Sequence, residues 1–158
     1  MATPASIARH PIHPMLVPLP IGLWIFSLVC DLVFRFGSSD LVWDLMAFYT
    51  MLGGLIGALL AAVPGFIDFL SLNDPRVKRI ALTHLLLNLT VVALYAVNLW
   101  LRTTSPPGAG LPVLLSVVAV LLLSVSGWLG GELVFRHGVA VERPVAPTGS
   151  RAEGRSSN

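Results

Sequence analysis

Four long runs of apolar residues limit what this chain can fold into more than any other feature. They lie near residues 15–36, 41–63, 80–101 and 112–135. A helix needs about 20 consecutive apolar residues to cross the hydrocarbon core of a bilayer, and each run is long enough. Of the 158 residues, 55% are apolar and 11% are charged, roughly half the charge of an average soluble domain. The sequence therefore predicts an all-α fold, a four-helix transmembrane bundle within residues 1–142.

The positive charges predict how this bundle is oriented. With four spans, both termini and the connection between the second and third spans lie on one side of the membrane. The other side carries only Arg35 and Arg102 among the 10 lysines and arginines. Because basic residues gather in cytoplasmic loops, both termini are predicted to be cytoplasmic. The basic residues on that side are Arg9, Arg76, Lys78, Arg79, Arg136, Arg143, Arg151 and Arg155.

Other sequence features exclude several classes of protein. The basic residues fit a membrane surface, so no nucleic-acid partner is predicted. The chain has a single cysteine, Cys30, which excludes an internal disulfide. It has no nucleophile elbow, HExxH motif, P-loop or Rossmann glycine pattern, so no hydrolase or transferase is predicted. Residues 143–158 are rich in Pro, Ser, Gly and Arg and predict a disordered cytoplasmic tail.

Two of the four histidines stand at the start of the first apolar run, in the stretch His10-Pro-Ile-His13-Pro14. A residue before proline is pushed into an extended conformation. An extended polyproline chain turns every three residues. His10 and His13 are therefore predicted to be extended and to face the same way, with Pro14 as the first residue of the helix.

The predicted topology brings all four histidines and two carboxylates to the cytoplasmic side. His84 lies about one turn inside that interface, with Asn88 four residues later on nearly the same face. Ionisable side chains in apolar surroundings are costly unless they have partners, so their default interpretation is a functional site. The six residues are His10, His13, Asp68, His84, Glu132 and His137.

The first hypothesis for this cluster is a b-type haem. Two histidines on different helices can hold the iron inside a helical bundle, while the propionates reach the basic rim. His13 and His84 are the predicted pair of ligands, and His10 and His137 are the further candidates. Since no histidine lies near the opposite face, at most one haem is predicted.

Other hypotheses use the same residues. A proton relay or solute path would use the near-neutral pKa of histidine. Histidines and acids at helix ends are also ordinary interface residues, in which case the bundle is a scaffold. A divalent metal such as zinc can be bound by imidazole and carboxylate groups. The predicted metal ligands are His10, His13, His84, Asp68 and Glu132.

Local spacing predicts two ion pairs and one close helix contact. Asp31 with Arg35, and Glu132 with Arg136, are spaced four residues apart on one helix. Arg76 and Arg79 are candidate partners for Asp68. In the second run, which is expected to end at Pro64-Gly65, small residues recur at every fourth position and predict tight helix packing or a homodimer. They are Gly53, Gly57 and Ala61.

The chain resembles the bacterial membrane-protein family DUF2231 over roughly residues 8–142. The resemblance implies a four-helix domain in the bacterial inner membrane. Some relatives are joined to a Rieske-type iron–sulfur domain, which implies redox chemistry and a haem. This chain has neither that domain nor its ligands, so the implied partner is a separate redox protein. The matching motifs lie at residues 10–22, 64–68, 84–88 and 127–139.

Overall fold

The computed structural model describes residues 4–8 and 10–141, and these residues form five helices and one small hairpin. The hairpin pairs β1 (Ser6–Ile7) with β2 (His10–Pro11) in antiparallel fashion. The helices are α1 (Ile12–Leu16), α2 (Pro18–Phe36), α3 (Leu41–Leu70), α4 (Pro75–Arg102) and α5 (Gly110–Phe135). Because α1 and α2 form one membrane-length segment, the described residues contain four helical spans. This confirms the predicted fold class.

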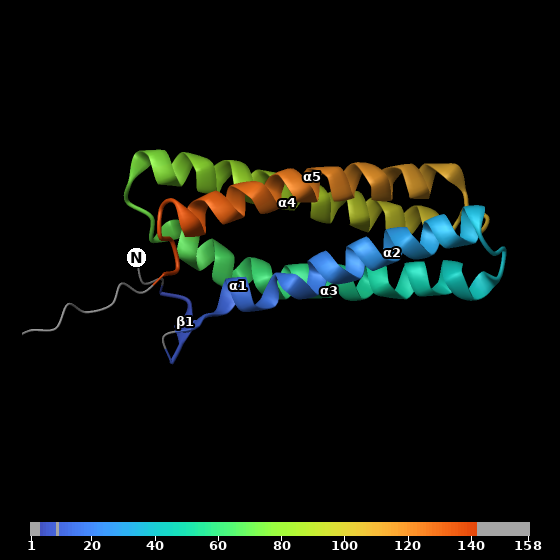
Figure 1. The fold of residues 1–158 in the computed structure, drawn as a ribbon, viewed down its shortest axis with the longest axis horizontal. Helices are drawn as coiled ribbons and strands as arrows, with labels where there is room; N and C mark the ends of the chain where they lie inside the picture. The colour runs from blue at the N-terminus through green and yellow to red at the C-terminus, as the bar shows by residue number, and fades with distance from the viewer. Residues whose placement is uncertain (1–3, 9, 142–158) are drawn as a thin grey trace, which may run out of the picture.

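The four spans form an antiparallel bundle in which α2 packs along α3 and α4 packs along α5 (Figure 1). Contacts between α3 and α4, and between α2 and α5, close the ring of helices. The diagonal helices α2 and α4 meet at the centre, where Trp24 stacks on Tyr95 with ring centroids 4.4 Å apart. Met51, Val91 and Ala119 complete the middle of the core. Many large apolar side chains point out of the bundle and are exposed, as expected for positions that face lipid.

The two ends of the bundle differ in what they carry. One end, called the hairpin end below, holds β1 and β2, the turn between α3 and α4, and the last residues of α5 (Figure 1). The other, called the loop end, holds the turn between α2 and α3 and the 103–109 connection from α4 to α5. The start and the finish of the described chain therefore share one end. The tail predicted for residues 143–158 lies outside the described residues.

Helix α3 is longer than the sequence predicted. The expectation that it ends at Pro64-Gly65 is wrong, because α3 continues through Pro64 to Leu70. A proline inside a helix removes one backbone hydrogen bond and disturbs the carbonyl groups of the preceding turn. In membrane proteins a side chain from a neighbouring helix can bond such a carbonyl. Here the imidazole of His13 bonds the carbonyl of Ala61, three residues before Pro64.

The start of α1 also differs from the prediction. His10 is extended within β2, as expected, but His13 is helical because α1 begins at Ile12. The expectation of an extended His13 and a helix starting at Pro14 is therefore wrong. Backbone N–H groups in the first turn of a helix have no helical partner, so Pro14 fits there without losing a bond.

Aspartates fix the starts of α3 and α4. The side chain of Asp40 accepts a hydrogen bond from the N–H of Val42 at 3.0 Å. The side chain of Asp74 accepts one from the N–H of Arg76 at 2.8 Å, and Pro75 occupies the first turn of α4. Both are normal N-terminal caps. The cap at Asp74 lets α4 begin at Pro75, five residues before the apolar run that starts near residue 80.

Small residues of α3 allow a close approach to α2. Gly54, Gly57 and Ala61 are buried, whereas Gly53 is half-buried. A Cβ atom on Gly54 would lie 2.5 Å from the indole of Trp24. Trp24 also donates its Nε1–H to the carbonyl of Met51 at 3.3 Å. The predicted role of small residues in packing is confirmed, with the contact centred on Gly54.

Candidate functional site: a histidine pair at the hairpin end

His13 lies on α1 and reaches across to the proline-containing turn of α3. Its Nδ1 is 2.8 Å from the carbonyl oxygen of Ala61. A carbonyl oxygen only accepts hydrogen bonds, so Nδ1 carries the proton. A Cβ atom on Gly65 would lie 2.6 Å from this nitrogen, so glycine is needed where the ring crosses the helix. His13 is thus held against the backbone of α3 with Nε2 as its second nitrogen.

His84 lies on α4 and is held in the same manner by α5. Its Nδ1 is 2.8 Å from the carbonyl oxygen of Ser126 and 3.0 Å from the Ser126 hydroxyl. The carbonyl again places the proton on Nδ1. The amide of Asn88 donates to Nε2 of His84 at 3.1 Å and to its backbone carbonyl at 2.9 Å. A Cβ atom on Gly130 would lie 3.1 Å from the ring, so the backbone of α5 is close as well.

The two imidazoles converge between the helices. Their ring centroids are 6.5 Å apart, and their planes are nearly perpendicular at 86°. Each ring has Nδ1–H on a backbone carbonyl, which leaves a lone pair on each Nε2. Metal-binding histidines commonly show this arrangement, because the Nδ1 bond fixes the tautomer and orients the ring. His13 and His84 are the two histidines paired as haem ligands from the sequence, and that role stays a prediction.

The other two histidines do not join this pair. His10 is exposed, and its Nδ1 bonds the carbonyl of Ala8 at 2.9 Å within the hairpin. His137 lies in the turn after α5, where its backbone N–H bonds the carbonyl of Glu132 at 3.3 Å. All four histidines are at the hairpin end, but among the described residues neither His10 nor His137 joins His13 and His84 in a group of three possible metal ligands.

The two candidate carboxylates are engaged elsewhere. Asp68 is buried, and its Oδ1 accepts a hydrogen bond from the N–H of Ala5 at 3.0 Å, which anchors the segment before β1. Glu132 lies 3.4 Å from Arg136 across one helical turn, which confirms that predicted ion pair. Among residues 4–8 and 10–141, no three histidine, cysteine or carboxylate side chains come together as a metal-binding group.

A second group of buried polar side chains lies at the loop end, and the sequence prediction missed it. Asp31 accepts a hydrogen bond from Arg102 at 2.6 Å, and their side chains are only 2% and 7% exposed. The predicted pairing of Asp31 with Arg35 is wrong, since Arg35 instead donates to the Gly108 carbonyl at 3.1 Å. The i, i+4 rule considers one helix, whereas the Asp31 side chain turns into the bundle towards α4.

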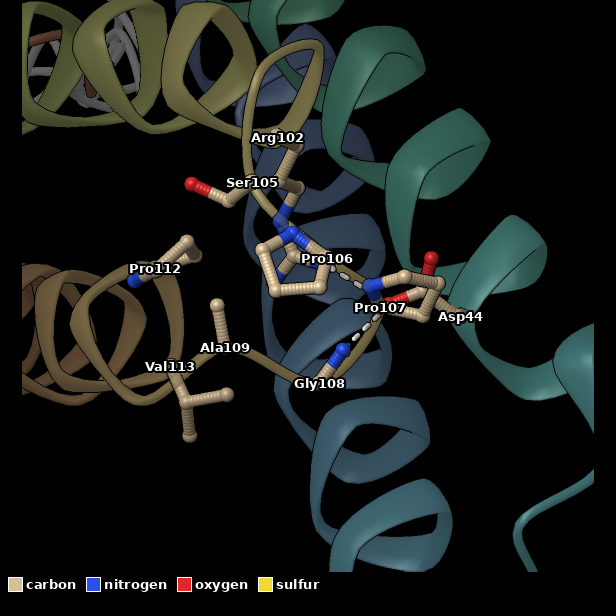
Figure 2. A pocket seen from close by; sticks show the side chains of 9 residues that line it. All are labelled: Asp44, Arg102, Ser105, Pro106, Pro107, Gly108, Ala109, Pro112 and Val113. Atoms are coloured by element: carbon tan, nitrogen blue, oxygen red, sulfur yellow. Dashed lines mark hydrogen bonds and ion pairs between the residues drawn. The ribbon is translucent and has the colours of Figure 1, made fainter.

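More polar groups surround this ion pair. Arg102 donates to Asn98 Oδ1 at 3.1 Å, and Asn98 donates to the Ser116 hydroxyl at 2.9 Å. Asp44 lies 3.8 Å from Arg102 and accepts a hydrogen bond from the N–H of Gly108. Figure 2 shows both contacts at the edge of a cavity of about 70 Å³ between the 103–109 loop and the helix ends. The spacing of Asn98 and Arg102 on α4 was the available sequence signal.

Comparison with known proteins identifies one family. A family model described as a predicted membrane protein, DUF2231, matches residues 9–143. No curated protein and no solved structure matches the chain significantly. The match covers both groups of buried polar side chains.

Proposed function

The chain belongs to DUF2231, a family of predicted membrane proteins, and from that premise we propose that it is a membrane electron-transfer component that binds one b-type haem. His13 and His84 would hold the haem iron. The observation that supports this most directly is the convergence of two imidazoles from different helices, each with Nδ1 on a carbonyl and a lone pair on Nε2.

The donor set and its spacing fit a bis-histidine site. Two imidazole nitrogens bound to one metal ion at about 2 Å each would place their ring centroids roughly 5–6 Å apart. The centroids of His13 and His84 are 6.5 Å apart. If bound, the haem would supply reversible one-electron transfer, and hydrogen bonds to its histidine ligands would tune its reduction potential. The hydrogen bonds from both Nδ1–H groups to backbone carbonyls are bonds of this kind.

Neighbouring residues have definite tasks in this proposal. For iron to bind Nε2 of His84, the amide of Asn88 would have to give up its hydrogen bond to that nitrogen. It would keep its second bond, to the His84 backbone carbonyl. Gly65 and Gly130 keep side-chain bulk away from the two rings. Exposed basic residues at the hairpin end are suited to bind the propionates and an acidic redox protein, which would supply the electron. They are Arg76, Lys78, Arg79 and Arg136.

The proposal is tested by absorption spectra of detergent-purified protein expressed with ample haem. We expect a Soret band together with sharp α and β bands after reduction with dithionite. His13→Ala and His84→Ala should each abolish the low-spin spectrum, because each removes one axial ligand. His10→Ala is the matched control, since it removes an exposed histidine whose Nδ1 bonds the Ala8 carbonyl within the hairpin.

Two results would contradict the proposal. A colourless wild-type protein under these conditions excludes haem binding, and elemental analysis for zinc, iron and copper then tests the metal hypothesis. An unchanged spectrum in His13→Ala or His84→Ala would assign the axial ligands to other residues.

A further inference from the structure

A line of polar side chains runs along the buried face of α4 from the hairpin end to the loop end. His84, Asn88, Tyr95, Asn98 and Arg102 are separated by four, seven, three and four residues, which places them on one stripe of the helix. Tyr95 and Asn98 are 0% exposed. Polar side chains this deep in a membrane bundle are costly and mark functional pathways.

Both ends of this stripe continue into polar groups on other helices. At the loop end Arg102 reaches Asp31 on α2, and Asn98 reaches Ser116 on α5. Asp31 also accepts a hydrogen bond from Ser116 at 3.4 Å. At the hairpin end His84 contacts Ser126 on α5, and its ring centroid lies 6.5 Å from that of His13. The stripe therefore runs from the cavity at Asp44 to the histidine pair, with polar groups on other helices at both of its ends.

Tyr95 lies between the two polar groups, and its hydroxyl has no hydrogen-bond partner among the described residues. Leaving a buried hydroxyl unpaired costs about 1–3 kcal/mol. Native proteins normally satisfy such a group with an internal water molecule. We therefore expect a water molecule to bind this hydroxyl inside the bundle.

We propose that this stripe is a proton path through the bundle, from the cavity at Asp44 and Arg102 past Tyr95 to the hairpin end. A water in the cavity gives a proton to Asp31 and is restored by a proton from the water behind it. Asp31 then gives its proton to a water on the Tyr95 side, so each group returns to its starting state. Tyr95 relays the proton, while Asn88 and Asn98 orient water. The cavity of about 70 Å³ at the loop end has room for one or two waters.

One apolar segment separates the two halves of the path. Between Asn88 and Tyr95, about 10 Å along the helix, the stripe is filled by Val91, which is 0% exposed. Met51 and Leu123 belong to the same core cluster. Apolar constrictions of this kind gate by excluding water. The described conformation is thus the closed one, and conduction requires water to enter beside Val91.

The test is proton flux into phospholipid vesicles that contain the purified protein and a trapped pH-sensitive dye. A potassium diffusion potential set with valinomycin drives the flux. We expect wild-type flux above that of protein-free vesicles, loss of this flux in Tyr95→Phe, and a higher flux in Val91→Thr, which adds a hydroxyl to the gap. Thr50→Val is the matched control, because that hydroxyl bonds the Met46 carbonyl of its own helix.

Tyr95→Phe is a specific test because it removes only the unpartnered hydroxyl and should leave the bundle folded. Asp31→Asn, which removes the proposed proton acceptor, is the second variant and should also lose the flux. Wild-type flux equal to that of protein-free vesicles, or full flux in both variants, would overturn the proposal. The readout does not require haem, so a colourless conducting protein separates this inference from the proposed electron transfer.

Discussion

At the scale of single residues, the contact between Gly65 and His13 offers a direct test of the site. A Cβ atom on Gly65 would lie 2.6 Å from Nδ1 of His13 and 2.8 Å from Cε1. Gly65→Ala should therefore push the ring off the Ala61 carbonyl and lower the free energy of unfolding by about 1–3 kcal/mol. Thermal unfolding in detergent, followed by circular dichroism, measures this loss.

Gly127→Ala is the matched control on another span. A Cβ atom on Gly127 would meet nothing within 4 Å. Alanine is the better helix former by about 1 kcal/mol, so this variant should be as stable as wild type or more stable. If the two alanine variants were equally stable, the His13 ring would be able to move away from Gly65 without a loss of stability, and the prediction would be contradicted.

The sequence was informative about which histidines meet, but not about how they are held. Topology alone brought His13 and His84 to the same end, and the structure confirms that they converge. Predicted depth in the membrane ranked them above His10 and His137, but hydropathy gives no direction around a helix and so could not show that their rings meet. The carbonyl partners, Ala61 and Ser126, lie 48 and 42 residues away in the chain, beyond any local pattern.

At the scale of helices, the ion pair between Asp31 and Arg102 joins the diagonal spans α2 and α4. Their side chains are 2% and 7% exposed. Removing one partner of a buried pair costs about 3–5 kcal/mol, since the remaining charge has no counter-charge. Arg102→Met should therefore lower the free energy of unfolding by about that amount, measured by denaturant titration in mixed micelles.

Two further variants separate pairing from other effects. Asp31→Asn combined with Arg102→Met removes both charges, so the double variant should lose less stability than the sum of the two single losses. Arg136→Met is the control, because the Arg136 side chain is 74% exposed beside Glu132. Its effect should stay below about 1 kcal/mol. Additive single effects would contradict a direct interaction between Asp31 and Arg102.

Helix ends were harder to predict than helix positions. Each of the four apolar runs became a span, because length and hydropathy are properties of the sequence itself. The rule that proline ends a helix failed at Pro64, where a neighbouring helix supplies the partner for a nearby carbonyl. The start of α4 at Pro75 follows from the cap at Asp74, in a segment too polar to appear in a hydropathy run.

At the scale of the whole molecule, the two polar groups occupy opposite ends of one bundle, so the orientation decides which of them faces the cytoplasm. Exposed Arg76, Lys78 and Arg79 at the hairpin end lead us to propose that this end is cytoplasmic in a bacterial inner membrane. The histidine pair would then open towards cytoplasmic partners. The cavity at Asp44 and Arg102 would open to the other side.

Labelling of single cysteines tests this orientation on a Cys30→Ser background, which removes a thiol that is 0% exposed. Thr104→Cys reports the loop end and Arg79→Cys the hairpin end, and both positions are exposed. An impermeant maleimide added to intact spheroplasts should label Thr104→Cys at once, and Arg79→Cys only after the membrane is permeabilised. The reverse pattern would place the histidine pair outside the cell, and the electron donor and the direction of the proton path would have to be reassigned together.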